Sequence, residues 1–235
     1  MKEQNQATQT KGRLDFYALM LRYPFIFFLL AALLFFGAGL HNEYADDAWR
    51  VTSDYSRRNV QVEQGIDGIP EIFKSRYSEA SDGISTTASY GYRPLPEASF
   101  ALEWALWGQA PRAAHAVNLV LYAGVCTLFL GLMRKLFPDT KPLFLLATAL
   151  LFLIHPVHSE IVFAHKNREA LMAGIFGLWY LLEIHAYFTS EKPKHFWVAM
   201  FSFVLGLFCK DDIFLFMTLV PGIWWIHFRG SLQQI

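Results

Sequence analysis

The sequence predicts an all-α membrane protein, a bundle of about six transmembrane helices with a large extracytoplasmic loop after the first helix. The first observation is composition: 54% of the 235 residues are hydrophobic and only 17% are charged, whereas soluble domains carry about 25% charged residues. Second, the apolar residues form runs, not an alternating or 3.6-residue stripe, and runs are typical of helices in lipid. Third, one long polar stretch, residues 41–112, follows the first run.

Six apolar runs are the predicted membrane helices, and a helix needs about 20 residues to cross the hydrocarbon core. The third run is about 18 Å long as a helix, too short to cross, and the last two are also short. Pro24 and Gly37 lie inside the first run and Pro221 inside the last, where neighbouring helices can satisfy the backbone groups they leave free. The runs are 16–40, 113–133, 143–154, 170–188, 196–208 and 213–228.

These runs divide the chain into four parts. Residues 1–13 form a polar cytoplasmic tail, and 14–40 form the first transmembrane helix. Residues 41–112 form the extracytoplasmic loop with an acidic pair and an interfacial helix, and 113–235 form the membrane helix bundle. Because the tail has no small-residue cleavage site, we expect a retained helix and not a signal peptide.

Basic residues in the short loops predict the orientation, since Lys and Arg accumulate on the cytoplasmic side. With the N-terminus inside, nine basic residues lie on the inner side, and the short outer loops hold only Lys166, Arg168 and Lys210. The long loop counts little in this rule. We therefore predict a multi-pass protein of the bacterial inner membrane or the endoplasmic reticulum with a cytoplasmic N-terminus.

The polar loop carries signs of folded structure. Residues 59–63 predict a short strand, 67–74 begin like a helix, and 81–89 are a Ser/Thr/Gly linker. Residues 100–107 predict a helix lying on the membrane. Residues 108–111 end this helix before the second membrane span begins. The aromatic residues expected at the membrane interface are Phe100, Trp104 and Trp107.

The loop begins with two adjacent carboxylates, Asp46 and Asp47, a few residues after the first membrane helix. One interpretation is chemistry on a lipid-carried substrate: a carboxylate can take a proton from a hydroxyl, and a neighbouring like charge raises its pKa. The other interpretation is a helix cap or a solvated loop, because acidic residues are common at helix starts.

Two further polar clusters are predicted on the outer face together with the acidic pair. One spans residues 155–168 and the other is Cys209-Lys-Asp-Asp212. The short third helix leaves residues 155–158 below the outer surface, inside protein or a wet cavity, because lipid cannot solvate irregular backbone. Ionisable residues at such depth indicate function.

His155, His158 and Glu160 allow two interpretations. Imidazole and carboxylate suit zinc or manganese, but the spacing matches none of the strong zinc motifs, so we expect no metal. We expect the histidines to shape a turn or bind substrate, and Glu160 to pair with an arginine. Zero net charge gives no argument for nucleic acid, and Cys126 and Cys209 form no disulfide framework.

The order of several motifs resembles the membrane part of the transmembrane and tetratricopeptide-repeat O-mannosyltransferases, which are GT-C glycosyltransferases. The similarity covers residues 40–215, and its most specific elements are Tyr92-Arg-Pro-Leu95 and the histidine motif. The motifs are Asp46-Asp47, Ile69-Pro-Glu-Ile-Phe73, Tyr92-Arg-Pro-Leu95, Gly108-Gln-Ala-Pro-Arg-Ala-Ala-His115, Asn118-Leu119 and His155-Pro-Val-His-Ser-Glu160.

This resemblance implies transfer of a mannose-like sugar from a polyprenyl-phosphate donor to an acceptor hydroxyl, on a protein or glycan, at the extracytoplasmic side. One of Asp46 and Asp47 then corresponds to the general base. The departing phosphate needs cations, for which Arg93, Arg168 and Lys210 are the candidates. Arg168 is the best of the three, because it lies next to the histidine motif. Alternatively, Arg93 pins the loop and Lys210 anchors a helix end.

Two departures from the family support a second function class. The family implies further membrane helices and a repeat domain, which a partner chain would supply here, and Cys209-Lys-Asp-Asp212 replaces a more usual Ser-Lys-Glu. The alternative is therefore a non-catalytic, truncated subunit that binds a lipid carrier or scaffolds a complex. A transporter ranks third. It would need charged residues at mid-membrane, whereas the charged residues of this chain are predicted to cluster at the outer face.

Overall fold

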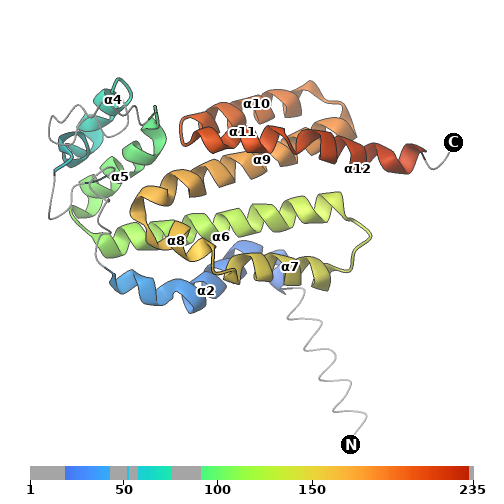
Figure 1. The fold of residues 1–235 in the computed structure, drawn as a ribbon, viewed down its shortest axis with the longest axis horizontal. Coiled ribbons are helices and arrows are strands. Elements are labelled where there is room, and N and C mark those ends of the chain that lie inside the picture. Colours follow the sequence, from blue (N-terminus) through green and yellow to red (C-terminus); the bar gives the residue numbers. More distant parts are fainter. Residues whose placement is uncertain (1–18, 43–51, 53–57, 76–90, 233–235) are drawn as a thin grey trace, which may run out of the picture.

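The computed structural model describes residues 19–42, 52, 58–75 and 91–232. Within these ranges the chain is helical and has no β-strand, which confirms the all-α fold class. The helices of Figure 1 are, in order, α2 (Pro24–Phe36), η1 (Gly37–His41), α3 (Val60–Glu63), η3 (Gly65–Gly68), α4 (Ile69–Ile72), α5 (Pro94–Trp107), α6 (Pro111–Leu136), α7 (Pro142–Ile154), α8 (His158–Phe163), η4 (His165–Asn167), α9 (Arg168–Ser190), α10 (Pro193–Leu207), η5 (Asp211–Ile213), α11 (Phe214–Met217) and α12 (Val220–Leu232).

Three of the described helical segments are long and apolar enough to cross a membrane: Pro24–His41, Pro111–Leu136 and His165–Ser190. α7 is apolar but only 13 residues long, as its sequence predicts. α10 and α12 have 15 and 13 residues and are also short for a full crossing. The chain is therefore a polytopic membrane protein, and the count of six crossings stays a prediction.

Two long helices, α6 and α9, lie side by side at the centre of the bundle (Figure 1). α2 and α7 pack against α6, while α10 and α12 pack against α9. The α6–α7 and α9–α10 connections share one end, and α5 and the turn between α10 and α11 lie at the opposite end. The latter end carries the predicted cations.

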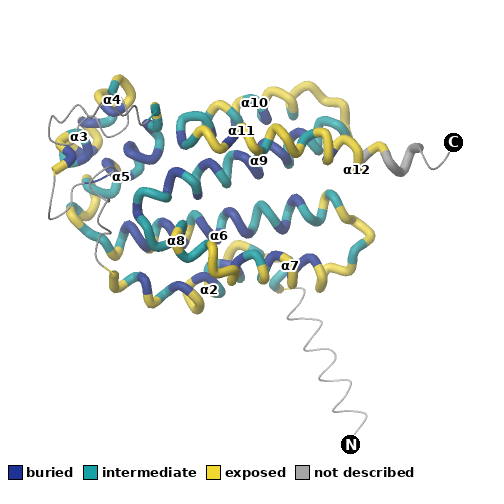
Figure 2. The backbone as a smooth tube through the Cα atoms, viewed as in Figure 1, coloured by how far each residue is buried: buried dark blue, intermediate teal, exposed yellow. Residues whose placement is uncertain are grey.

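The inner faces of α6 and α9 are the most buried parts of the bundle (Figure 2). Small residues allow the neighbouring helices to approach closely, as in other membrane bundles. Ser202 on α10 is fully buried, and its hydroxyl donates to the Phe176 carbonyl of α9 at 2.8 Å. A Cβ added at Gly177 would lie 2.5 Å from the Phe216 ring, so α11 packs directly on this glycine.

Large apolar side chains cover the outward faces of the outer helices. Leu34 on α2 is 80% exposed and Trp197 on α10 is 68% exposed. Figure 2 shows the same exposed faces along α10 and α12. Such surfaces suit contact with lipid tails, in agreement with a membrane protein.

Two prolines predicted inside membrane spans begin helices instead. Pro24 is the first residue of α2, directly after a break at Tyr23, and Pro221 lies in the first turn of α12. Proline lacks the N–H that a helix interior uses and clashes with the preceding turn, but it suits the first turn of a helix. The first and last predicted spans are therefore divided at these prolines.

The described part of the loop is a small helical unit, and the predicted strand at residues 59–63 is wrong. Val60–Glu63 form a helical turn because the Asn59 side chain accepts a hydrogen bond from the Val62 amide (3.1 Å). The unit has its own core, which includes Ala114 of α6 and so fastens the loop to the start of that helix: Val62, Ile72, Phe100, Ala101 and Ala114.

α5 confirms the predicted helix at residues 100–107, and Gly108 ends it with a positive φ of 64°. The expected interfacial position of Phe100 is wrong, because this residue is 2% exposed and faces the loop core. Trp104 packs against the same core and is half-buried, while Trp107 is exposed. Contact of Trp107 with the membrane interface stays a prediction.

Candidate functional site

The predicted acidic pair, Asp46 and Asp47, lies outside the described residues, so its role as general base stays a prediction. The predicted cations Arg93, Arg168 and Lys210 are all described. They belong to three segments that meet at one end of the bundle: the residue before α5, the first residue of α9, and the turn before η5. Their surroundings differ sharply.

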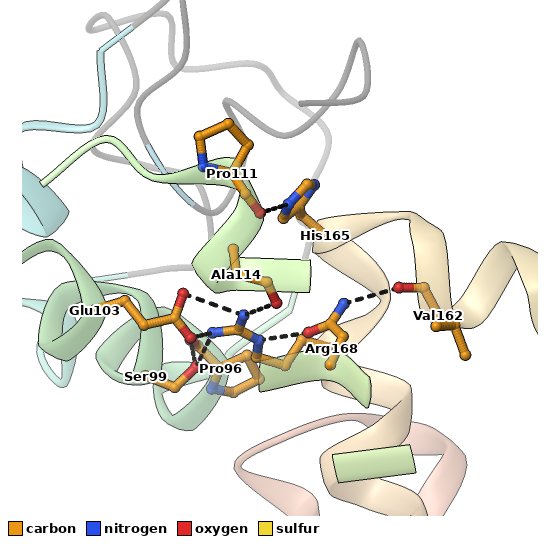
Figure 3. Close-up of polar contacts among 9 residues, drawn as sticks. Pro96, Ser99, Glu103, Pro111, Ala114, Val162, His165 and Arg168 are labelled. Carbon is orange, nitrogen blue, oxygen red and sulfur yellow. Dashed lines mark hydrogen bonds and ion pairs between the residues drawn. The ribbon is translucent and has the colours of Figure 1, made fainter. Parts of the chain in front are cut away.

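Arg168 is completely enclosed by protein (Figure 3). Its Nε donates to Asn118 Oδ1 at 2.9 Å, and its two terminal nitrogens donate to the Glu103 carboxylate at 2.5 and 3.2 Å. Ser99 Oγ and the Ala114 carbonyl accept two further hydrogen bonds at 3.1 and 3.0 Å. The Phe100 ring lies against the guanidinium, 3.8 Å from Cζ to the ring centroid.

The five N–H groups of Arg168 therefore all have protein acceptors, and none remains for a phosphate. We correct the predicted phosphate contact to a structural role, in which Arg168 joins α5, α6 and α9. We call Arg168, Glu103, Asn118 and Ser99 the arginine pin. Burial raises the pKa of the Glu103 carboxyl, and the charge of Arg168 opposes this effect.

The arginine pin extends to the segment between α7 and α9. The Asn118 side chain donates to the Val162 carbonyl at 3.4 Å, and the His165 ring lies 3.4 Å from the Pro111 carbonyl (Figure 3). Both contacts tie the start of α6 to the region around α8 and η4. The pin thus fixes the relative positions of loop and bundle.

Glu169, the next residue along the chain, belongs to a different network. Its Oε1 accepts a hydrogen bond from Arg93 Nη1 at 2.7 Å and lies 3.5 Å from Lys210 Nζ. Asp212 Oδ2 lies 3.1 Å from Lys210 Nζ, and Asp211 Oδ2 lies 3.9 Å from Arg93 Nη2. We call Arg93, Glu169 and Lys210 the cation node, with Asp211 and Asp212 at its rim.

The side chains of the cation node are partly exposed on the protein surface. The side chains of Arg93 and Lys210 are 19% and 23% exposed, while the Glu169 side chain is 7% exposed. Asp211 and Asp212 are well exposed. Two cations thus share one buried carboxylate and keep part of their surface accessible.

The turn that carries Lys210 is held by the loop. Phe208 lies edge-on to the rings of Phe73 and Tyr92, with centroids 6.5 and 5.9 Å away. The Tyr92 hydroxyl donates to the Phe73 carbonyl at 2.6 Å, and the Leu95 amide donates to the Phe208 carbonyl at 3.2 Å. Loop residues therefore position both Arg93 and Lys210.

His158 closes the end of the short helix α7. Its Nδ1 lies 2.7 Å from the Phe152 carbonyl, and the Tyr122 hydroxyl donates to the Leu153 carbonyl at 2.7 Å. These carbonyls belong to the last turn of α7, and no further turn of that helix follows to donate backbone N–H groups to them. Burial lowers the pKa of His158, so the neutral ring donates through Nδ1. Tyr122 lies about 16 Å along α6 from its start.

The other two predicted residues of this motif, His155 and Glu160, are exposed. His155 Nδ1 accepts a hydrogen bond from the Val157 amide at 3.3 Å, so it shapes the turn. Glu160 is exposed and forms no ion pair with another described residue, so the expected arginine partner is not found there. Among the described residues, no three His, Cys, Asp or Glu side chains are grouped as metal ligands. Substrate contact by His155, His158 and Glu160 stays a prediction.

Four residues of these contacts were missed by the sequence analysis: Ser99, Glu103, Tyr122 and Glu169. Glu169 was a visible acidic residue in the first turn of a membrane helix, where most such residues serve the helix dipole. Nothing in the local sequence identifies its partners, which lie 76 residues earlier and in a later turn. The available signal was that two opposite charges, Arg168 and Glu169, are adjacent in sequence at the edge of an apolar run.

Comparison with known proteins places this geometry in context. No family model matches the chain, and no solved structure matches it significantly. The chain is 31% identical over 127 residues to protein O-mannosyl-transferase TMTC3 from Homo sapiens, covering 52% of this chain and 13% of the relative. It is 32% identical over 154 residues to TMTC1 and 37% identical over 115 residues to TMTC2, both from Mus musculus. These matches cover 63% and 49% of this chain.

The matched segments make up only 13–15% of the length of these three relatives. The relatives are all named as protein O-mannosyl-transferases. The chain therefore resembles the membrane part of the TMTC O-mannosyltransferases and is a glycosyltransferase-like membrane protein.

Proposed function

We propose that this protein transfers a mannose-like sugar from a polyprenyl-phosphate donor to an acceptor hydroxyl on the extracytoplasmic side of a membrane. The cation node carries this proposal. Arg93 Nη1 and Lys210 Nζ lie 2.7 and 3.5 Å from the same Glu169 oxygen, so they are at most about 6 Å apart. Two cations at this spacing can bind oxygens of one phosphate group.

The chemistry requires a base and a stabilised leaving group. The acceptor hydroxyl attacks the anomeric carbon while Asp46 or Asp47 takes its proton. The bond from that carbon to the phosphate oxygen breaks, and the phosphate keeps the electron pair. Arg93 and Lys210 then stabilise the charge that develops on the polyprenyl phosphate. The resemblance implies inversion at the sugar carbon, and no metal is needed for these steps.

The membrane setting suits this substrate. The cation node lies at an end of a bundle whose outer faces are apolar, so a lipid tail can stay among the helices while its phosphate reaches Arg93. The acceptor, a protein or a glycan, would approach from the outer side. In this proposal the N-terminus is cytoplasmic, the partners are the lipid-linked sugar and the acceptor, and no nucleic acid is involved.

The enclosure of Arg168, which leaves none of its N–H groups for a phosphate, favours a second candidate function. In this alternative the protein is a non-catalytic subunit that binds a lipid carrier or scaffolds a complex with a partner chain.

Reconstituted protein separates the two candidates. The purified chain, alone and with any partner chain, would be placed in nanodiscs with polyprenyl-phosphate mannose and an acceptor peptide. We expect Asp46→Asn or Asp47→Asn to abolish transfer while donor binding persists, because the carboxylate acts in the transition state. Arg93→Gln should weaken donor binding as well. Absence of transfer under both conditions, with normal assembly of the Asn variants, would support the subunit.

A further inference from the structure

One oxygen of the cation node has no hydrogen-bond partner among the described residues. Glu169 is 5% exposed, and its Oε1 serves both Arg93 and Lys210. Its Oε2 is buried and accepts no hydrogen bond from any described residue. A buried carboxylate oxygen without a donor costs free energy, and such atoms in folded proteins call for a specific explanation.

Among the described residues, the groups around Glu169 do not supply the missing donor. Asp211 and Asp212 are acceptors, and Lys210 is shared between Glu169 and Asp212. Burial, and to a smaller extent the charge of Glu169, raises the pKa of the Cys209 thiol to about 12, so this thiol stays protonated. Its hydrogen is directed to the Leu205 carbonyl, 3.3 Å from Sγ.

We propose that Glu169 Oε2 accepts a hydrogen bond from a sugar hydroxyl of the donor whose phosphate binds Arg93 and Lys210. This inference rests on the proposed function, and it adds a contact that selects the sugar-bearing lipid over the bare lipid phosphate. Because Oε1 and Oε2 belong to one carboxylate, only a hydroxyl close to the phosphate can reach Oε2. The hydroxyl on the carbon next to the anomeric carbon meets this condition.

Oε2 is buried, so a ligand reaches it only if a neighbouring side chain moves. The 3.5 Å separation of Lys210 Nζ from Glu169 Oε1 is long for a charge-assisted hydrogen bond, which is about 2.7–2.9 Å. Lys210 has a flexible stem and can follow a phosphate. Arg93, at 2.7 Å, holds the carboxylate in place during that movement.

The test measures binding of two probes to the full chain in nanodiscs: polyprenyl phosphate and polyprenyl-phosphate mannose. We expect Glu169→Gln to weaken binding of the mannose-bearing lipid about 10-fold more than binding of the bare phosphate, because the charged acceptor is lost. The matched control, Asp212→Asn, removes a carboxylate from the same lysine and should change both affinities by the same factor. Equal losses for the two probes in Glu169→Gln would overturn the hydroxyl contact.

A second measurement needs no variant and so avoids any failure of Glu169→Gln to fold. A donor with a 2-deoxy sugar lacks the hydroxyl in question, and wild-type protein should bind it about 10-fold or more weakly than polyprenyl-phosphate mannose. Equal affinity for these two donors would overturn the inference and leave the phosphate site intact. If wild-type protein binds neither the bare phosphate nor the mannose-bearing lipid, the proposed function fails, and the inference fails with it.

Discussion

Arg168 and Glu169 are neighbours in the chain, yet they belong to two ionic networks with opposite properties. In the arginine pin, every N–H of Arg168 is satisfied by protein and the side chain is completely buried. In the cation node, Glu169 holds two partly exposed cations, and one of its oxygens has no partner in the described part of the chain. One network is saturated, and the other is incomplete.

This difference supports a structural role for the arginine pin and underlies the proposed binding role of the cation node. A saturated buried network fixes the fold and has nothing left for a ligand. An incomplete one keeps donors and acceptors that a ligand can use. Sequence position gives no such distinction, because charge and residue type are similar in both. The following predictions test the comparison, from the largest expected effect to the smallest.

Replacing Arg168 should have the largest effect on stability. Arg168→Met leaves the Glu103 carboxylate buried without its partner, which should lower the free energy of unfolding by about 3–5 kcal/mol. Equilibrium unfolding of the protein in detergent measures this change. The double variant Arg168→Met/Glu103→Leu removes both charges and should recover most of the loss. Failure of the double variant to recover would show that hydrogen bonds other than the ion pair dominate the pin.

Replacing Arg93 should have a smaller effect on stability and a larger effect on ligand binding. Arg93→Gln leaves Glu169 with Lys210, so we expect a loss of about 1–3 kcal/mol in the free energy of unfolding. Binding of polyprenyl phosphate should weaken about 10-fold or more. If Arg93→Gln destabilises the protein as much as Arg168→Met does, the two networks do not differ as described.

The contact between His158 and the end of α7 offers a third test, because here the hydrogen bond is made by a neutral side chain. Because burial lowers the pKa of His158 in the folded state, stability is full above the unfolded pKa of about 6.5 and is lost as the pH falls below it. The loss is at most about 1.4 kcal/mol per pH unit. His158→Gln keeps a donor for the Phe152 carbonyl and should remove this pH-dependent part, as unfolding at pH 7.5 and pH 5.5 would show. If stability depends on pH as strongly in His158→Gln as in the wild-type protein, this role of His158 is wrong.

The rim of the cation node should affect binding only slightly. Asp211 is 71% exposed and lies 3.9 Å from Arg93, so Asp211→Asn should change the free energy of unfolding by less than about 0.5 kcal/mol. Removing this carboxylate lessens competition for Arg93, and we expect polyprenyl phosphate to bind about 2-fold more tightly. Weaker binding in Asp211→Asn would mean that Asp211 helps to orient the cation.

The sequence predicted the fold class and the order of the apolar helices because long apolar runs have few alternatives to helices in lipid. The short α7 and the end of α5 at Gly108 also followed from local residues. The strand at residues 59–63 failed because alternating Val and polar residues also suit a single helical turn, and the Asn59 cap decides between them.

The candidate site was only partly predictable. Arg93, Arg168 and Lys210 were named from their charge, but successive residues on a helix point about 100° apart, so Arg168 and Glu169 face different partners. Glu103 lies 65 residues from Arg168 in sequence, and no local pattern identifies that pairing. The distinction between a saturated and an incomplete network exists only in three dimensions.

The arginine pin and the cation node together also set an order for the protein's biogenesis. During synthesis, Arg93 and Glu103 leave the ribosome long before their partners Glu169 and Arg168, which are 76 and 65 residues later. In the proposed orientation, the loop crosses the membrane with these two charges still solvated by water, and it can dock only after α9 has entered the membrane. Insertion of the fourth apolar run is thus the step that commits the loop to its place. A ribosome stalled before residue 168 should display an undocked loop, accessible to protease, above a membrane anchor that is already in place.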